Sequence, residues 1–215
     1  MKKITVIILS LSVGACVIFS GCSASERANL SSAATSFAGS TKAAIGAAAS
    51  TTSAAGQTVS DGSVSVYFPR AGQDAEGQLI STLGTAQKKL DVAIYSFTDT
   101  EIADAIAAAK KRGVTVRLMT DRESAGESYQ KKALGIVKAA GVPIKENTHS
   151  GIMHLKVSII DTSTVTTGSF NYTKSAQNQN DENLVIIHSS ALTSQYEAEF
   201  ARMWSDTSNY ADWNG

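Results

Sequence analysis

One stretch of about thirty residues, Ile152–Asn183, constrains the fold more tightly than any other part of the chain. It contains two runs of strand-forming residues together with side chains of the types that enzymes use for catalysis. The pattern H-x-K-x4-D is formed by His154, Lys156 and Asp161. The polar groups that follow belong to Gly168-Ser169-Phe170-Asn171 and to Glu182-Asn183. Imidazole, ammonium, carboxylate, hydroxyl and carboxamide groups are thus concentrated in one short segment that is expected to form strands.

The first strand of this stretch is expected to carry two polar side chains on one face. Successive side chains of a strand point to opposite faces, so His154 and Lys156 share one face and Leu155 and Val157 the other. A histidine two residues before a lysine is in itself most often surface decoration. Here the largely apolar run 157–160 predicts a buried strand, and a buried lysine is rare unless it is paired or functional.

The same stretch resembles the catalytic motif of the phospholipase D superfamily. The segments IMHLK at 152–156, TGSFN at 167–171 and NDEN at 180–183 match its small single-motif endonuclease branch in residues and in spacing. The resemblance extends from about Ser63 to about Trp204. It implies an α/β fold of the superfamily's type, an α/β/α sandwich in a single domain with a central mixed, mostly parallel sheet.

The residue types of the motif fit a displacement at a phosphodiester. A neutral imidazole is nucleophilic near neutral pH, because its unperturbed pKa is about 6.5. His154 is therefore expected to attack phosphorus and form a phosphohistidine. Lys156 and Asn171 supply an ammonium and a carboxamide for the phosphoryl oxygens, and Ser169 can donate its hydroxyl to the phosphate or within the site.

Two further residues complete the predicted site. The resemblance gives Glu182 the part of the acceptor that fixes the tautomer of a catalytic histidine. Asp161 belongs to the motif and is counted with its catalytic residues. We nevertheless expect Asp161 to be structural, anchoring the strand and the following turn rather than acting on the substrate.

The reaction needs a second imidazole, because a general acid must protonate the leaving oxygen. The chain contains one H-x-K motif, and neither His149 nor His188 has a lysine two residues later. These two histidines are expected to be an ordinary loop residue and an ordinary strand-end residue. A two-fold homodimer that brings His154 of both subunits into one site is the simplest solution, and the resemblance also implies it.

No metal or cofactor is expected, because the three histidines are dispersed and no Asp, Glu and His grouping has ligand spacing. The sequence thus predicts a metal-independent phosphodiesterase, a non-specific endonuclease that hydrolyses DNA or RNA. Two alternatives stay open: a phospholipase D-type hydrolase or transferase acting on phospholipid headgroups, and a non-catalytic binding module. One motif and about 150 domain residues count against the lipid substrate, since lipid-acting members generally carry two motifs in a longer chain.

Strand and helix patterns alternate through the rest of the domain, which indicates a sheet covered by helices on both faces. The expected strands outside Ile152–Asn183 are 64–68, 90–97, 114–119, a short edge strand from 144, and 184–187. The expected helices are 75–90, 100–112, 130–140 and 192–204.

Some side chains near these elements have expected roles. Thr98 or Thr100 is expected to cap the second helix. The segment Asp121–Glu123 follows the carboxyl end of a strand, where such folds place ligand-binding loops, and is a candidate for a substrate groove. The last helix carries an aromatic stripe that we expect in the core, formed by Tyr196, Phe200 and Trp204.

Residues 1–22 resemble a lipoprotein signal peptide. Two lysines precede an uncharged, mostly apolar run, Ile4–Phe19, and Phe19–Cys22 resembles the site where a bacterial signal peptidase cuts before an acylated cysteine. Cys22 is therefore the expected lipidation site. Cys16 fits less well, because it leaves a very short apolar run. An uncleaved anchor is a further alternative, although sixteen residues are short for a membrane span.

The segment 23–61 is rich in Ala, Ser, Thr and Gly. Such a composition cannot bury enough apolar area to offset the entropy of ordering, so we expect a flexible tether before a catalytic domain at 62–215. Both cysteines precede this domain, which excludes a disulfide or a cysteine metal site within it. We expect an exported protein, anchored by lipid to a membrane and facing the periplasm or the cell exterior.

Charge gives no support for tight, non-specific coating of nucleic acid. Without the two lysines of the signal segment, the chain has 17 basic and 19 acidic side chains, a net charge of about −2. Many nucleic-acid-binding domains are strongly basic. Catalysis on nucleic acid does not require such an excess of positive charge.

Overall fold

The structure is a computed structural model, and it describes residues 57–59 and 63–215. The strands are β1 (Gln57–Val59), β2 (Val64–Tyr67), β3 (Lys89–Ile94), β4 (Thr115–Thr120), β5 (Ile144–Asn147), β6 (Lys156–Ile160), β7 (Thr164–Gly168), β8 (Leu184–His188) and β9 (Tyr210–Asp212). The helices are the short 3-10 helix η1 (Pro69–Ala71), α2 (Ala75–Gly84), α3 (Thr100–Lys111), α4 (Arg122–Gly126), α5 (Ser128–Ala139), α6 (Lys174–Asn178) and α7 (Ser190–Ser205). Within the described residues the strands form one sheet in the order β1-β2-β8-β7-β6-β3-β4-β5-β9.

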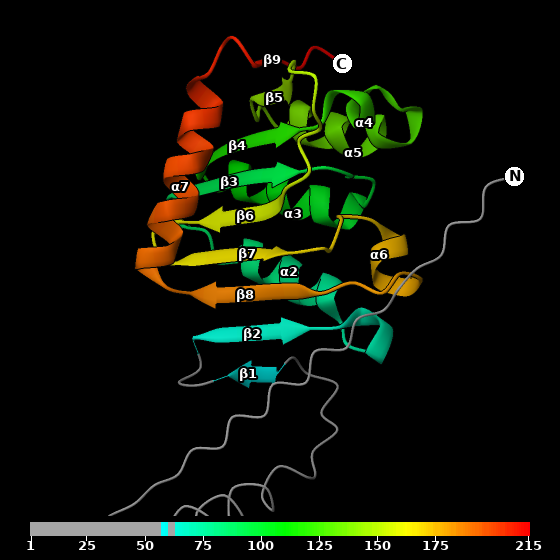
Figure 1. Cartoon of the computed structure of the whole chain (residues 1–215), viewed down its shortest axis with the longest axis vertical. Coiled ribbons are helices and arrows are strands. Elements are labelled where there is room, and N and C mark those ends of the chain that lie inside the picture. The colour runs from blue at the N-terminus through cyan, green and yellow to red at the C-terminus, as the bar shows by residue number, and fades with distance from the viewer. Residues whose placement is uncertain (1–56, 60–62) are drawn as a thin grey trace, which may run out of the picture. The chain divides into compact units, whose positions relative to one another are not determined.

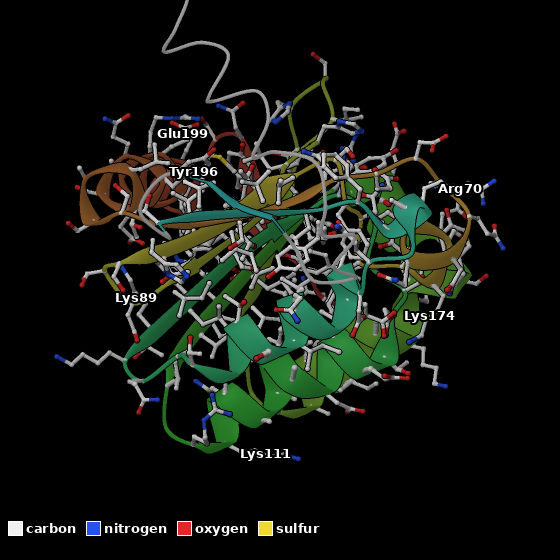
Figure 2. The ribbon with its side chains drawn as sticks, turned by 90° about the horizontal axis from the view of Figure 1, so that it is seen from below. Arg70, Lys89, Lys111, Lys174, Tyr196 and Glu199 are labelled. Atoms are coloured by element: carbon white, nitrogen blue, oxygen red, sulfur yellow. The ribbon has the colours of Figure 1, made fainter. Side chains whose placement is uncertain are left out.

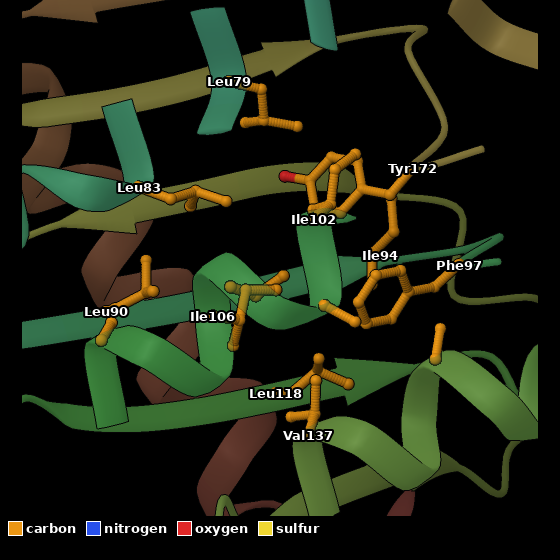
Figure 3. Packing of buried hydrophobic residues seen from close by; sticks show 14 of the residues in the cluster. Leu79, Leu83, Leu90, Ile94, Phe97, Ile102, Ile106, Leu118, Val137 and Tyr172 are labelled. Carbon is orange, nitrogen blue, oxygen red and sulfur yellow. The ribbon is translucent and has the colours of Figure 1, made fainter. Parts of the chain in front are cut away.

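Helices cover both faces of this sheet, with α2 and α3 behind it and α7 in front in Figure 1. The core under α2, α3 and α5 contains buried side chains such as Leu79, Ile102, Leu134 and, from β3, Leu90 and Ile94 (Figure 3). The core under α7 contains Val157, Ile159, Val165, Phe200 and Met203, with Tyr196 and Trp204 packed against it. The predicted α/β/α sandwich and the core position of the aromatic stripe are confirmed.

The sheet is mixed, as predicted, but it is not mostly parallel. Among the strand pairs of the described residues, β3–β4 and β4–β5 are parallel and the other six are antiparallel. Parallel neighbours need a long crossover, which α3 supplies between β3 and β4, and α4 with α5 between β4 and β5. After β6 the chain has no such crossover between neighbouring strands, because β6 and β7 are joined by a short turn and α6 spans only Lys174–Asn178. Strands β6, β7 and β8 therefore pair with their neighbours in antiparallel fashion.

Two loops at one edge of the sheet are bound to each other. The Tyr172 N–H donates to the Ser96 carbonyl at 3.1 Å, and the Thr98 N–H donates to the Tyr172 carbonyl at 2.9 Å. Beneath this pairing the rings of Phe97 and Tyr172 pack edge to face, 5.9 Å apart, and both are buried (Figure 3). The segment after β3 and the segment that carries Ser169 and Asn171 are thereby fixed relative to each other.

Three boundary predictions need correction. Strand β1, Gln57–Val59, falls within the predicted tether, so that prediction does not hold for these three residues. Strand β5 is not an edge strand, because β9 pairs with it. Helix α3 is capped by Asp99, whose carboxylate accepts from the N–H groups of Glu101 and Ile102, and not by either of the two threonines.

The predicted signal segment, with Cys22, and the rest of the predicted tether lie outside the described residues. Among the residues that are described, no helix combines the length and the apolar character needed to cross a membrane.

A buried ion pair ties α7 to the sheet. Asp91 of β3 is fully buried and accepts two hydrogen bonds from Arg117 of β4, at 2.7 and 2.6 Å. The same guanidinium lies 3.4 Å from a Glu197 oxygen and stacks over the rings of Phe200 and Trp204, with its carbon 4.9 and 5.2 Å from their centroids. Arg117 is thus the main partner of the Asp91 charge, and the Lys89 ammonium lies further away, at 3.9 Å.

Replacing Arg117 by Ala should lower the free energy of unfolding by up to about 3–5 kcal/mol, because it leaves the buried Asp91 carboxylate with only the more distant Lys89 as a partner among the described residues. The matched control is Arg202→Ala, which breaks an exposed pair with Glu199 and should change stability little. Urea denaturation of both variants checks this, and equal midpoints for Arg117→Ala and the unchanged protein would contradict the assignment.

Candidate active site

The histidine of the motif, His154, lies just before strand β6 rather than within it, because β6 begins two residues later. Its neighbours on both sides are held by hydrogen bonds. The Met153 N–H donates to the buried carboxylate of Asp121 at 3.0 Å, and the Leu155 carbonyl accepts from the Tyr95 N–H at 2.9 Å. Asp121 and Tyr95 directly follow β4 and β3, so the exposed imidazole is positioned at the carboxyl ends of these two parallel strands.

The ring of Tyr95 brings the first two motif residues together. The centroids of the Tyr95 and His154 rings are 4.6 Å apart at an interplanar angle of 58°. The Lys156 ammonium lies 4.9 Å from the centroid of the same ring and donates to the His154 carbonyl at 2.9 Å. A cation over an aromatic face is attracted by the ring's negative potential. Tyr95 therefore serves as a common support for the imidazole and the ammonium.

Lys156 is buried, with 7% of its surface exposed. Burial lowers the pKa of its ammonium, and the negative charge of Glu182 opposes this effect in part. Strand β6 alternates as predicted: Val157 packs under α7, whereas Lys156 and Ile160 belong to the opposite face. Lys156 is thus buried, as the sequence predicted, and a buried lysine is expected to be paired or functional.

Strand β7 ends in a turn that presents the hydroxyl and the carboxamide. Gly168 has φ 137°, and a Cβ there would lie 2.2 Å from the Asn183 carbonyl oxygen, so only glycine fits. The Asn183 N–H donates to the Ser169 hydroxyl oxygen at 3.1 Å, which leaves the hydroxyl hydrogen free to donate to a ligand. The carboxamide oxygen of Asn171 accepts from the Ser96 N–H at 3.3 Å, which directs its NH2 group away from that backbone.

These side chains line one open cavity of about 470 Å³, formed by His154, Lys156, Gly168, Ser169, Asn171 and Glu182. Five of the six predicted catalytic residues are therefore brought together. Glu182 accepts from the Asn180 amide at 3.1 Å. Within residues 63–215 neither ring nitrogen of His154 has a hydrogen-bond partner, so the role that the resemblance gives to Glu182, as an acceptor for a histidine, is not seen in the single chain.

Asp161, the sixth predicted catalytic residue, does not line this cavity. It follows the far end of β6, about 16 Å from the strand's start at 3.3 Å per residue. Its carboxylate accepts from the N–H groups of Gln87, Lys88 and Lys89, at 3.1, 2.7 and 2.9 Å. Its φ of 52° places it in the left-handed region, where Asp is tolerated better than most residues. Asp161 therefore anchors the turn, as expected, and lies away from the residues that line the cavity.

The other candidates from the sequence have structural roles. His149 accepts from the Gly151 N–H at 3.1 Å, and His188 ends β8 and bonds Thr164 at 3.0 Å. Of the segment Asp121–Glu123, Asp121 supports the residue before His154 and also caps α4. Within 57–59 and 63–215 no three His, Cys, Asp or Glu side chains are grouped to hold a metal ion. Metal independence of the reaction stays a prediction.

Sequence reasoning missed Tyr95, Ser96 and the positioning role of Asp121. The sequence Tyr95-Ser96-Phe97-Thr98 directly follows the central strand β3. Loops at the carboxyl ends of parallel strands commonly face ligands, so polar residues at this point of the chain were a usable indication.

The comparison with known proteins now places these residues in a family. The family described as "Cardiolipin synthase, PLD-like domain" matches residues 79–204, which is more than half of the chain. The chain belongs to the phospholipase D superfamily. The match includes the whole H-x-K-x4-D motif and the turn with Ser169 and Asn171.

Solved structures agree with this assignment. Nuc from Salmonella typhimurium, a phospholipase D family member, is 32% identical, with a TM-score of 0.66, and the match covers 71% of this chain and 99% of that one. NucT from Helicobacter pylori is 28% identical, with a TM-score of 0.61, over 66% of this chain and 94% of its own. The predicted fold and the resemblance to the small single-motif branch are confirmed, since Nuc is matched nearly end to end.

Curated relatives carry lipid names. Mitochondrial cardiolipin hydrolase of Xenopus tropicalis is 33% identical over 132 residues, which are 61% of this chain and 62% of that protein. The chain spans about three fifths of the length of the first curated relatives it matches. Their names agree with the predicted class, a phosphodiester hydrolase, but not with a nucleic-acid substrate.

The lowered pKa of Lys156 has a consequence for the pH profile. If the charged ammonium binds the phosphate, kcat/KM should fall on the alkaline side at a pH below the ordinary lysine pKa of about 10.4. Lys156→Arg should be slower but should lack this limb, because a guanidinium stays charged. Initial rates between pH 6 and 10.5, taken as about the stable range, check this. An unchanged alkaline limb in Lys156→Arg would assign it to another group.

Asp161 should matter for stability and not for chemistry. Burial raises its pKa, but the three backbone N–H donors outweigh burial, so the folded-state pKa is lowered. Its stabilisation is then present above the unfolded pKa of about 3.9 and is lost as the pH falls through the lower folded value. Asp161→Ala should lower the free energy of unfolding at pH 7 by about 1–3 kcal/mol. The deficit should shrink at low pH.

The matched control is Asp161→Asn, which keeps the tolerance for positive φ and one acceptor oxygen and should cost less than Asp161→Ala. Both variants should keep the kcat of the folded enzyme. A stable Asp161→Asn protein that has lost its activity would restore Asp161 to the catalytic set.

Proposed function

We propose that the chain is a metal-independent phosphodiesterase that cleaves nucleic acid, DNA or RNA, through a phosphohistidine at His154. The observation that carries this proposal is the cavity itself. It holds an exposed imidazole without a hydrogen-bond partner within 63–215, beside a buried ammonium, a carboxamide and a free hydroxyl hydrogen. This is a nucleophile placed next to donors for phosphoryl oxygens.

The first step forms a bond from a ring nitrogen of His154 to phosphorus and breaks the bond from phosphorus to the leaving oxygen. Charge that develops on the phosphoryl oxygens is met by Lys156, Asn171 and Ser169, which are already oriented by Tyr95, Ser96 and Asn183. Donors that are in place before the reaction cost no reorganisation in the transition state. In the second step, water attacks phosphorus and releases the imidazole.

The leaving oxygen takes a proton, and the residues that line the cavity include no second imidazole to supply it. We assign this proton to His154 of a second subunit in a two-fold homodimer. Two apolar side chains near His154 in the sequence are exposed in the single chain: Ile152 at 52% and Leu155 at 40%. Burial of Ile152 and Leu155 against a second copy would remove their apolar surface from water and would bring the two histidines together.

The nucleic-acid substrate is inferred from the chain's similarity to the small proteins Nuc and NucT. Nuc and NucT are matched over 99% and 94% of their lengths, whereas the cardiolipin hydrolases are matched over about three fifths. Phospholipid headgroups are a second candidate, favoured by the names of those relatives and by the exposed apolar side chains around the cavity, which include Phe68 at 46%. Export and a lipid anchor at Cys22 would suit either substrate, and we propose them on the sequence pattern alone.

Substrate tests separate these candidates. The purified protein, incubated with EDTA, should cleave plasmid, single-stranded DNA or RNA and should leave cardiolipin and phosphatidylcholine vesicles intact. His154→Ala should reduce cleavage by at least about 1000-fold. Lipid hydrolysis without nuclease activity would select the second candidate, and nuclease activity that EDTA abolishes and a divalent ion restores would contradict the mechanism.

The shared site has its own test. Leu155→Asp should place a carboxylate at the proposed interface and yield a monomer with little activity, although every residue of the cavity is intact. Tyr129→Asp, a change at another exposed apolar side chain (60%), should remain dimeric and active. Light scattering combined with rate measurements decides this, and a fully active Leu155→Asp monomer would overturn the shared site.

A further inference from the structure

A second cavity adjoins the catalytic one and is larger, about 550 Å³. The residues that line it are Ser169 and members of two segments, the turn that follows β2, with Phe68, Arg70 and Ala71, and Asp181–Asn183. Ser169 and Glu182 line both cavities, so a molecule bound at His154 can continue past them into this second space.

The turn that carries Phe68 is held in place by hydrogen bonds. The Phe68 N–H donates to the side-chain oxygen of Gln73 at 2.6 Å, and its carbonyl accepts from the Ala71 N–H at 3.0 Å. Gln177 of α6 donates to the Gln73 carbonyl at 3.1 Å and accepts from the Glu76 N–H at 2.9 Å. Phe68 is thus held in place by hydrogen bonds of its own backbone and keeps 46% of its surface exposed beside the cavity.

The segment Asp181–Asn183 supplies polar groups to this cavity. Asn183 is fixed by Ser169, since the Ser169 N–H donates to its side-chain oxygen at 3.1 Å and its own N–H donates to the Ser169 hydroxyl at 3.1 Å. Within residues 63–215 the Asp181 carboxylate has no hydrogen-bond partner. Arg70 contributes the one positive charge among the residues that line this cavity. It projects from the same side of the molecule as Lys174, while Lys111 lies elsewhere (Figure 2).

We propose that this second cavity binds the nucleoside next to the scissile phosphate, with its base stacked on Phe68. This inference rests on the proposed function and names the part of the substrate that the site reads. A nucleobase combines an apolar face with a polar edge. The cavity matches it, because its lining combines one aromatic ring with carboxylate and carboxamide groups. An acyl chain offers no hydrogen-bond donor to the Asp181 carboxylate, which has no partner within residues 63–215.

A base reaches Phe68 only when it is unstacked. In a duplex this requires opening a base pair, whereas a single strand offers its bases at little cost. The cavity therefore makes the enzyme prefer single-stranded over double-stranded substrate. Arg70 is placed to meet a neighbouring phosphate, so it should add affinity that depends on salt and not on sequence.

The decisive substrates are two single-stranded oligomers of equal length, one with bases and one built from abasic deoxyribose units. Both present the same phosphodiesters to His154. The protein should cleave the base-bearing oligomer about tenfold better in kcat/KM, as one stacked base predicts. Phe68→Ala should lose about tenfold on that oligomer and nothing on the abasic one. Phe68→Tyr should restore the rate.

Tyr129→Ala is the matched control, because Tyr129 is also exposed and lines none of the described cavities. It should leave both rates unchanged. Equal cleavage of the two oligomers, with Phe68→Ala as active as the unchanged protein on both, would overturn this inference and leave the proposed function standing. Loss of cardiolipin hydrolysis in Phe68→Ala without loss on the oligomers would assign the cavity to lipid. A protein that cleaves no nucleic acid would overturn both.

Arg70 is tested by binding to the base-bearing oligomer in the His154→Ala background, where no cleavage interferes. Arg70→Ala should weaken binding at low salt and reduce the slope of log Kd against log salt by about 0.7, the value for one phosphate of a single strand. Lys111→Ala, which removes an equal charge outside the cavity, should keep the slope. Equal slopes for all three proteins would remove Arg70 from the site.

Discussion

The register between β3 and β6 is the constraint on which the site depends. Ile94 pairs with Lys156, and one step further the Tyr95 N–H donates to the Leu155 carbonyl. This pairing sets the Tyr95 ring against both His154 and Lys156. A slip of one residue would turn Lys156 to the face that packs under α7. The Asp161 carboxylate, which accepts hydrogen bonds from N–H groups at the start of β3, holds this register from the far end of β6.

The sequence predicted the layers of the fold and the residues of the cavity more accurately than it predicted their connections. Apolar periodicity identifies strands and helices, and the motif identifies His154, Lys156, Ser169, Asn171 and Glu182. Strand direction is not contained in such local patterns, because the same strand can pair either way. The expectation of a mostly parallel sheet therefore had no support from the strand patterns themselves. The ring contacts of Tyr95 and the positioning role of Asp121 escaped prediction for a related reason, since these contacts join segments far apart in the chain.

In the proposed mechanism the cavity supplies a nucleophile and its phosphate donors, while the acid and the acceptor for the imidazole are not found among the described residues of the single chain. The proposed homodimer would account for two features of residues 63–215, the exposed apolar side chains near His154 and the imidazole nitrogens without a hydrogen-bond partner. In our proposal the neighbouring cavity extends the same site toward Phe68. The motif residues then act on the phosphate, which every diester shares, and the turn after β2 distinguishes what the phosphate carries.

The covalent role of His154 is the central claim, and mass spectrometry of a single turnover tests it most directly. The protein is mixed with a short single-stranded oligonucleotide, quenched in alkali within the first turnover and digested. The peptide that contains His154 should carry a phosphate-linked nucleotide that is released in acid, and the adduct should be absent from His154→Ala. Cleavage by the unchanged protein with no adduct at any quench time, or an adduct on another side chain, would contradict the account.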